Sequence, residues 1–451
     1  NAASYWTYFV GGVIMISSFF MPEGAARSGW TSYPPLSVFE NGQTIWLISM
    51  IFLITSSLLG SMNIIVTIVQ LRAPGLTWMR LPIFTWAQFV TSFLLVLAFP
   101  PLEAAAVMQL MDRVASTSFF LPSGLVMSGE IVDVAGSGSP LLWQHLFWFL
   151  AHPEVYVLIL PALGIVGEIL ANNTRKPIWG FKSIIYSMVF LGFISFIVWA
   201  HHMFLTGMGQ AMSAFFQTTT MIISIPSVVI LTSYFLSLWG GSIRFNTPML
   251  FALAFLPMFG IGGLTGLPLG LAASDIYLHD TYYVIGHFHY VVAPGTIFAL
   301  FAGIYYWFPK ITGKKMSEML GKLHFWPSLI FMNGIFMPMF IQGLAGVSRR
   351  LADGGQSYAH ASGVLEWNEF MSISAFCLGL AQIPFIVNII MSLFSGEKAS
   401  RNPWDSTTIE WAAPSPPVGH GNFDGPINVY HTAYEYSVPD AKEDFKPQFE
   451  N

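Results

Sequence analysis

Charged side chains are scarce in this sequence. They make up 9% of its 451 residues, whereas soluble domains carry roughly 25%. Hydrophobic residues account for 54%, and water cannot solvate such a chain, so most of it must face lipid or other apolar helices. The composition therefore excludes an ordinary soluble enzyme. The net charge of −5 is small and gives no indication of nucleic-acid binding.

Cysteine is nearly absent as well. The single residue Cys377 excludes an intrachain disulfide and any cysteine-based zinc or iron–sulfur site. Histidine is missing from the first 144 residues, although eleven histidines follow from His145 onwards. Because no cysteine cluster is available, these histidines are the candidates for binding a metal.

Long apolar runs fill most of the chain. A bilayer core of about 30 Å needs about 20 apolar residues per helix, and ten stretches qualify: residues 5–21, 44–70, 82–108, 141–169, 183–206, 214–239, 248–271, 282–308, 324–344 and 371–395. We therefore predict an all-α fold, a polytopic membrane helical bundle over residues 1–395. A proline-rich tail follows over residues 396–451, on the cytoplasmic side.

Lysine and arginine predict the orientation of the bundle, because loops on the inner side of a membrane are enriched in them. Fourteen of the eighteen fall on one side of a ten-span arrangement and four on the other. The four exceptions are Arg27, Arg113, Arg349 and Arg350. We expect an integral protein of a prokaryotic cytoplasmic membrane, with both termini inside.

Five histidines lie well within three of the predicted spans: His152, His201, His202, His287 and His289. Ionisable residues at membrane depth are costly and by default functional. A lone histidine there is often only a satisfied hydrogen-bonding residue, but five clustered in three helices are hard to explain in that way. Neutral imidazole is the commonest metal ligand, and without cysteine it suits copper or haem iron.

The spacing of these histidines indicates how they could share metals. His287 and His289 are separated by about 200° around a helix, so each could bind a different metal centre. His201 and His202 are separated by about 100°, close enough for both to reach one metal.

A tyrosine and an acid accompany the first of these histidines. His152 and Tyr156 are four residues apart and so adjacent on one helix face. Glu154 lies on the far side of the same helix, where an apolar span favours the protonated acid that a proton carrier needs. The alternative for Glu154 is a protonated, hydrogen-bonded structural residue.

Five sequence motifs resemble subunit I of the haem–copper oxidases, the cytochrome c and quinol oxidases of respiration. They read GWTSYPP over residues 29–35, WQHLFWFLAHPEVY over 143–156, WAHHMF over 199–204, HDTYYVIGHFHY over 279–290 and GLAGVSRR over 343–350. They occur in the family's order and in matching helices, and the resemblance covers nearly the whole chain up to the tail.

The resemblance implies a copper site and two haems. The copper ligands would be His152, His201 and His202, with Trp148 and Trp199 packed around them. Tyr156 would be covalently joined to His152 and would supply an electron and a proton for cleaving dioxygen. His287 would be the axial ligand of the high-spin haem that faces the copper, and His289 a ligand of the low-spin haem.

The resemblance also assigns residues at the outer surface. Arg349 and Arg350 would pair with haem propionates, which suits the guanidinium fork. His279 and Asp280 would bind magnesium near the interface with subunit II. The alternative is a solvated loop pair, since the magnesium site also needs a partner's carboxylate. The implied activity is reduction of dioxygen to water with protons from the inside, together with proton pumping. Cytochrome c or quinol would be the electron donor.

The sequence departs from the family at its low-spin haem. The family has twelve helices, and its low-spin haem takes a second histidine from helix two. The ten spans here match helices three to twelve, and Met50 and Met62 do not stand where that ligand would be. Either a separate polypeptide supplies two helices and the histidine, or the sequence is part of a longer protein. We expect the former.

A second departure concerns proton delivery. Ile230 stands where the family has a lysine that leads protons towards the tyrosine. Nearby hydroxyls could support a water path instead, or could simply form interhelical hydrogen bonds: Thr218–Thr220, Ser227, Thr232, Ser233 and Tyr234. Pumping is therefore a weaker expectation than oxygen reduction.

Three other functions are alternatives for this sequence, and specific residues argue against each of them. A nitric oxide reductase of the same superfamily would carry non-haem iron in place of copper, but that group generally lacks a tyrosine at the position of Tyr156. A non-enzymatic membrane transporter fits the composition, but not the histidine motifs. A subunit that has lost its metals does not fit either, because all the ligand positions are present.

Overall fold

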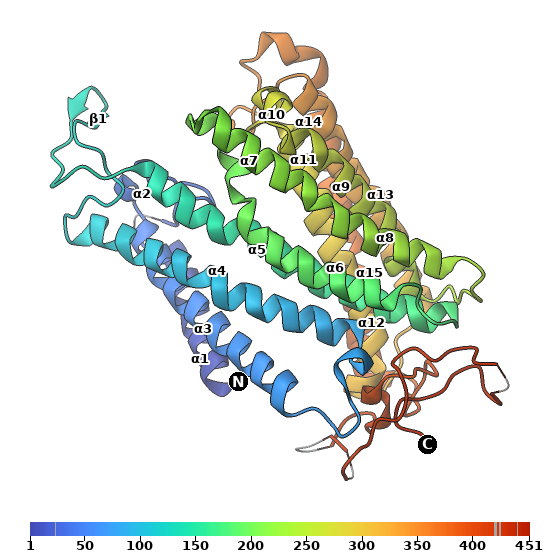
Figure 1. The fold of residues 1–451 in the computed structure, drawn as a ribbon. Helices are drawn as coiled ribbons and strands as arrows, with labels where there is room; N and C mark the ends of the chain where they lie inside the picture. Colours follow the sequence, from blue (N-terminus) through green and yellow to red (C-terminus); the bar gives the residue numbers. More distant parts are fainter. Residues whose placement is uncertain (23, 419–421, 424, 440) are drawn as a thin grey trace. The chain divides into compact units, whose positions relative to one another are not determined.

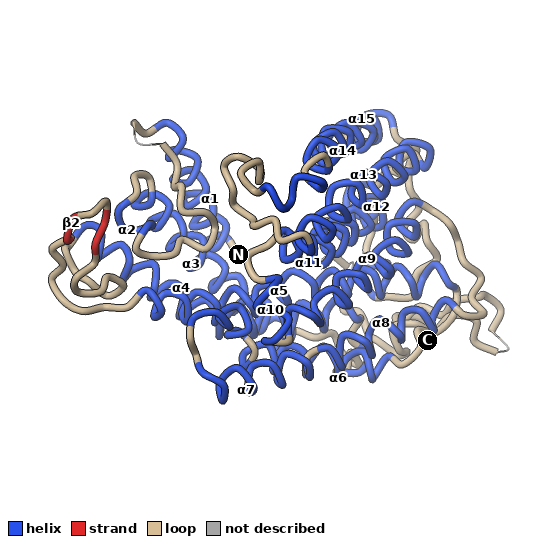
Figure 2. Tube along the Cα trace, turned by 90° about the horizontal axis from the view of Figure 1, so that it is seen from above, coloured by secondary structure: helices blue, strands red, loops and turns tan. Residues whose placement is uncertain are grey.

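The computed structural model describes residues 1–451 except 23, 419–421, 424 and 440. Helices predominate in its described part and strands are few (Figures 1 and 2), and within it ten helical segments are long and apolar enough to cross a membrane. The spans are Ala2–Phe20, Gln43–Gln70, Ile83–Val114, Pro140–Thr174, Phe181–Thr206, Gly209–Leu238, Thr247–Gly270, Tyr282–Thr312, Glu318–Leu344 and Trp367–Ser395. The predicted all-α membrane bundle of ten spans is confirmed.

Five spans are single helices and five combine shorter pieces. The single helices are α3 (Gln43–Gln70), α4 (Ile83–Val114), α5 (Pro140–Thr174), α9 (Thr247–Gly270) and α13 (Glu318–Leu344). The divided spans are α1–η1 (Ala2–Ser17, Ser18–Phe20), α6–η3–η4 (Phe181–Ile194, Ser195–Ile197, Trp199–Thr206), α7–α8 (Gly209–Ile222, Ser224–Leu238), α11–η5–α12 (Tyr282–Val291, Val292–Ile297, Phe298–Thr312) and α14–α15 (Trp367–Ala381, Ile383–Ser395).

The remaining elements are short. They are α2 (Leu36–Phe39), η2 (Trp78–Arg80), the antiparallel strands β1 (Val126–Met127) and β2 (Glu130–Ile131), α10 (Ala272–Leu278), η6 (Ala359–Val364) and η7 (Ile409–Ala412).

The chain forms two compact units. Unit 1 comprises Asn1–Leu71, Phe89–Val157 and Gly192–Thr219; unit 2 comprises Arg72–Gln88, Leu158–Leu191 and Thr220–Asn451. Within unit 1, α1 packs along α3. Within unit 2, α11 packs against α9 and α13, and α13 against α14 (Figures 1 and 2).

Two local irregularities bear on the histidine motifs. The backbone leaves helical geometry at Val198 (φ −128°) and at Met203 (φ −125°), so His201 and His202 lie on a short, kinked segment. After His289 the helix widens into the π-helical turn η5. This turn contains Pro294, which has no N–H to donate and therefore disturbs the regular hydrogen-bond ladder.

The tail after α15 belongs to unit 2 and packs against its helices. Arg175 at the end of α5 forms a bidentate ion pair with Asp444, with Nε–Oδ2 at 2.7 Å and Nη2–Oδ1 at 2.5 Å. This bond lowers the pKa of Asp444. Trp411 and Tyr436 of the tail are almost fully buried, so the tail contributes to the core of unit 2.

Candidate functional site

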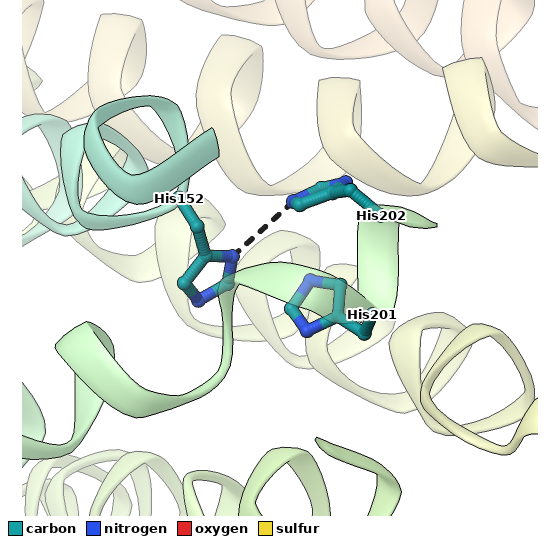
Figure 3. A group of neighbouring side chains, drawn as sticks. All are labelled: His152, His201 and His202. Carbon is teal, nitrogen blue, oxygen red and sulfur yellow. Dashed lines mark hydrogen bonds between the residues drawn. The ribbon is translucent and has the colours of Figure 1, made fainter. Parts of the chain in front are cut away.

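Three of the predicted metal ligands meet in unit 1. His152 comes from α5, whereas His201 and His202 come from η4 (Figure 3). One ligand atom of each lies within 4.8 Å of the other two, and His152 Nδ1 is 3.3 Å from His202 Nε2. The His201 ring stands at 90° to that of His152, with the centroids 4.5 Å apart. Three converging imidazoles fit a copper ion, for which nitrogen donors are suitable ligands.

Tyr156 lies beside this cluster. Its hydroxyl is 3.1 Å from Nε2 of His152, one helical turn away on α5. His152 therefore presents Nε2 to the tyrosine and Nδ1 to His202, which leaves Nδ1 as the nitrogen directed at a shared metal. Glu154, two residues before the tyrosine, is half-buried on the same helix.

Tryptophan and tyrosine side chains hold part of the cluster in place. The Trp148 ring stacks on the His202 ring at a centroid distance of 3.7 Å and an angle of 10°. Trp148 Nε1 donates to the hydroxyl of Tyr33 at 2.5 Å, and Trp199 Nε1 donates to Nδ1 of His145 at 3.3 Å. Tyr33 was missed as a site residue, although it belongs to the GWTSYPP motif.

The two histidines of α11 in unit 2 are oriented by backbone carbonyls. His287 Nδ1 is 2.9 Å from the carbonyl oxygen of Gly262 on α9, and His289 Nδ1 is 2.9 Å from that of Ile285. A carbonyl only accepts, so each Nδ1 must carry the proton, and in the neutral ring the lone pair is on Nε2. This is how proteins commonly fix an axial ligand, and it fits haem iron.

Neighbouring residues shape the space around these rings. A side chain at Gly266 would place its Cβ 2.7 Å from Cε1 of His287. The Phe336 ring of α13 stacks on His289 at 4.3 Å and 12°. Neither Gly266 nor Phe336 was predicted, because each lies far in sequence from the histidine that it contacts.

The outer-surface residues of the sequence prediction form a polar network in unit 2. Arg349 Nε is 3.1 Å from Asp280 Oδ1, whereas Arg350 is exposed. His279 Nδ1 is 2.9 Å from Oδ2 of Asp275, a buried acid that was missed although it lies one turn earlier on α10. Burial alone lowers the pKa of His279, but the hydrogen bond and charge of Asp275 outweigh it and raise this pKa.

The hydroxyls around Ile230 bond mainly to the backbone. Ser227 and Ser233 donate to carbonyls four residues earlier in α8, at 3.3 and 2.7 Å. Tyr234 donates to the Leu163 carbonyl of α5 at 2.7 Å, and Ile230 is fully buried. Tyr234 thus forms an interhelical hydrogen bond, whereas the two serines bond within their own helix.

Comparisons with known proteins identify the family of the chain. Residues 1–380 match the family described as "Cytochrome C and Quinol oxidase polypeptide I". The chain is 43% identical to the alternative cytochrome c oxidase subunit 1 of Bradyrhizobium diazoefficiens, over 99% of this chain and 77% of that protein. It is 42% identical to cytochrome c oxidase subunit 1 of Synechocystis sp., over 97% and 76%.

A solved structure has the same fold. It is a cryo-EM structure of a heme-copper terminal oxidase dimer, with a TM-score of 0.73 and 19% identity, covering 88% of this chain and 70% of that one. The family match and the curated relatives, together with the ten spans and the histidine cluster, show that the chain belongs to the haem–copper oxidase subunit I family, the oxygen-reducing catalytic subunits of respiratory oxidases.

Proposed function

We propose that His152, His201 and His202 hold the copper at which this subunit reduces dioxygen to water. The observation that carries the proposal is the convergence of their ligand atoms within 4.8 Å, beside a tyrosine hydroxyl 3.1 Å from one of them. When bound, copper and haem iron supply the electron transfer that this reduction requires.

The protein's own residues would orient a copper ligand and supply protons for the reduction. Tyr156 would hold a proton at its hydroxyl, next to His152, and release it towards the reacting oxygen. Trp148 would keep the His202 ring in one plane by stacking on it and would exclude water from that side. Glu154 would carry protons along α5; replacing it with glutamine keeps its shape but removes the exchangeable proton, so turnover should fall at constant metal content.

Two haems would be held by α11. His287 would present Nε2 to the high-spin haem and His289 to the low-spin haem, since both Nδ1 positions bond to carbonyls. Arg349 and Arg350 would pair with propionates. A second ligand for the low-spin haem would come from a segment outside residues 1–451, since residues 1–144 hold no histidine.

Partners and orientation follow from the same residues. His279 and Asp280 would bind magnesium together with a carboxylate from a subunit II-like partner through which electrons enter. The curated relatives are named cytochrome c oxidases, which favours cytochrome c over quinol as the donor. The lysine and arginine distribution supports both termini inside a prokaryotic cytoplasmic membrane. Proton uptake would come from that side, with pumping in addition.

Metal analysis of the purified complex tests the proposal. We expect two haem irons and one copper per copy of this chain, with a reduced-minus-oxidised optical spectrum showing a high-spin and a low-spin haem. A preparation with haem and non-haem iron but no copper would instead support the nitric oxide reductase alternative, against which the position of Tyr156 argues.

A further inference from the structure

One buried acid of unit 2 has no part in the proposed chemistry. Glu168 lies near the C-terminal end of α5, on the same helix as His152 and Tyr156. The tail contacts it there through Tyr434, and its exposure is 4%. Glu168 Oε1 accepts from the Phe84 amide at 3.1 Å and from the Tyr434 hydroxyl at 2.7 Å. The same hydroxyl accepts from the Ile83 amide at 2.8 Å, so a tail tyrosine joins the start of α4 to this acid.

The carboxyl of Glu168 has no ion-pair partner in the part of the chain that the structure describes. The titratable groups near it are Tyr234 of α8, Tyr306 of α12, and Tyr434 and Glu410 of the tail. These groups are neutral or anionic, so none of them would compensate a negative charge on Glu168.

The tail holds the second carboxyl, Glu410, and a cavity next to η7. Glu410 lies in η7, where it accepts from the Thr408 hydroxyl at 2.9 Å, and burial raises its pKa. The charge of Lys310 acts in the opposite direction and lowers the pKa of Glu410. Lys310 donates to the Arg401 and Ala413 carbonyls at 2.9 and 2.6 Å. A cavity of about 580 Å³ adjoins η7, lined by Arg401, Asn402, Asp405, Trp411 and Glu450, among others.

We propose that Glu168 is a proton-transfer residue of the oxidase, which takes protons from the side of the membrane that carries the tail. It accepts a proton from water on that side, becomes a neutral carboxylic acid, and returns to the carboxylate when it gives the proton up to the reduction of dioxygen, which consumes it. No electron moves in this step. The inference rests on the proposed function, which needs protons from that side. Another proton-transfer residue is needed there because Ile230 stands where the family has a lysine that leads protons towards the tyrosine.

A glutamine at position 168 tests the proposal in the purified holoenzyme. Glu168→Gln keeps the acceptor for Phe84 and Tyr434 but removes the exchangeable proton. We expect haem and copper content to be unchanged and turnover to fall by about a hundredfold, the lower end of general acid–base effects. A carboxyl C=O signal should also disappear from the reduced-minus-oxidised infrared difference spectrum, and Glu168→Asp should restore part of the rate and a shifted signal.

Two tail tyrosines provide a matched pair. Tyr434→Phe removes the hydroxyl that bonds to Glu168 and should shift the pH profile of turnover and the infrared signal. Tyr436→Phe removes a buried tail hydroxyl that bonds to Asn172 and Thr407 instead, and should leave both unchanged.

Several results would overturn the proposal. Wild-type turnover and an unchanged infrared signal in Glu168→Gln would make this acid structural, while the copper and haem assignments would stand. If Glu168→Gln assembles poorly, the tyrosine pair decides: equal effects of Tyr434→Phe and Tyr436→Phe would point to tail packing alone. Failure of the proposed function itself would appear separately, as absent copper in the unmodified complex.

Discussion

The histidines of unit 1 and those of α11 in unit 2 are positioned by different means. In unit 1, the rings of His152, His201 and His202 contact one another, Trp148 stacks on His202, and the Tyr156 hydroxyl lies beside His152. On α11, each Nδ1 of His287 and His289 is bonded to a backbone carbonyl. Backbone carbonyls thus fix the nitrogen that each α11 ring presents, whereas these contacts of the unit 1 rings are with other side chains.

The largest expected effect comes from removing one of the predicted copper ligands in unit 1. His201→Ala or His202→Ala removes a copper ligand and leaves α11 unchanged. Oxygen uptake should fall by at least roughly a hundredfold, because losing even an outer-shell partner typically costs roughly 10–100-fold. Copper content should drop while the low-spin haem spectrum persists. Normal oxygen uptake in either variant would refute the copper assignment.

Removing the tyrosine hydroxyl should have the next largest effect. Tyr156→Phe keeps the ring and the three histidines but deletes the group 3.1 Å from His152 Nε2. We expect turnover to fall by about a hundredfold at unchanged copper content, in the range of general acid catalysis. Steady-state oxygen consumption and copper analysis measure the two quantities. A fall in copper that matches the fall in rate would show a structural role instead.

A glycine on α9 tests whether the haem side depends on backbone spacing. Gly266→Ala would place a Cβ 2.7 Å from the His287 ring and should displace it from the Gly262 carbonyl. We expect several-fold lower occupancy or an altered spectrum of the high-spin haem, with copper content less affected. Gly260→Ala on the same helix is the control, since its Cβ would meet only Leu231 at 3.5 Å. Similar spectra for the two variants would contradict this account.

The smallest expected effect tests how Trp148 positions His202 in unit 1. Trp148→Phe keeps an aromatic ring over His202 but loses the bond from Nε1 to Tyr33. Copper affinity should fall by up to about tenfold, as for an outer-shell partner, and the rate at saturating copper should change little. Copper retention during titration with a chelator measures this. An affinity equal to that of the unmodified protein would show that stacking alone positions His202.

The sequence predicted the class and much of the site chemistry. Ten apolar runs were enough for the all-α membrane bundle, because a bilayer requires a minimum helix length whatever the packing. The edges were less accurate, as with the span predicted at 82–108 that extends over Ile83–Val114, since apolar content marks only the lipid-facing centre of a helix. The adjacency of His152 and Tyr156 followed from helical spacing, which is local.

Contacts between distant segments were decided only by the tertiary structure. Tyr33 meets Trp148, Gly266 makes room for His287, and Phe336 covers His289 because helices far apart in the chain pack together, and no spacing rule reports such pairs. The same holds for Glu168, which reads as one more residue at the end of a span. Only folding brings Tyr434 from the tail and the start of α4 onto its carboxylate. The sequence alone determined which residues could bind metals or protons, since that depends on side-chain chemistry; packing decided which of them meet.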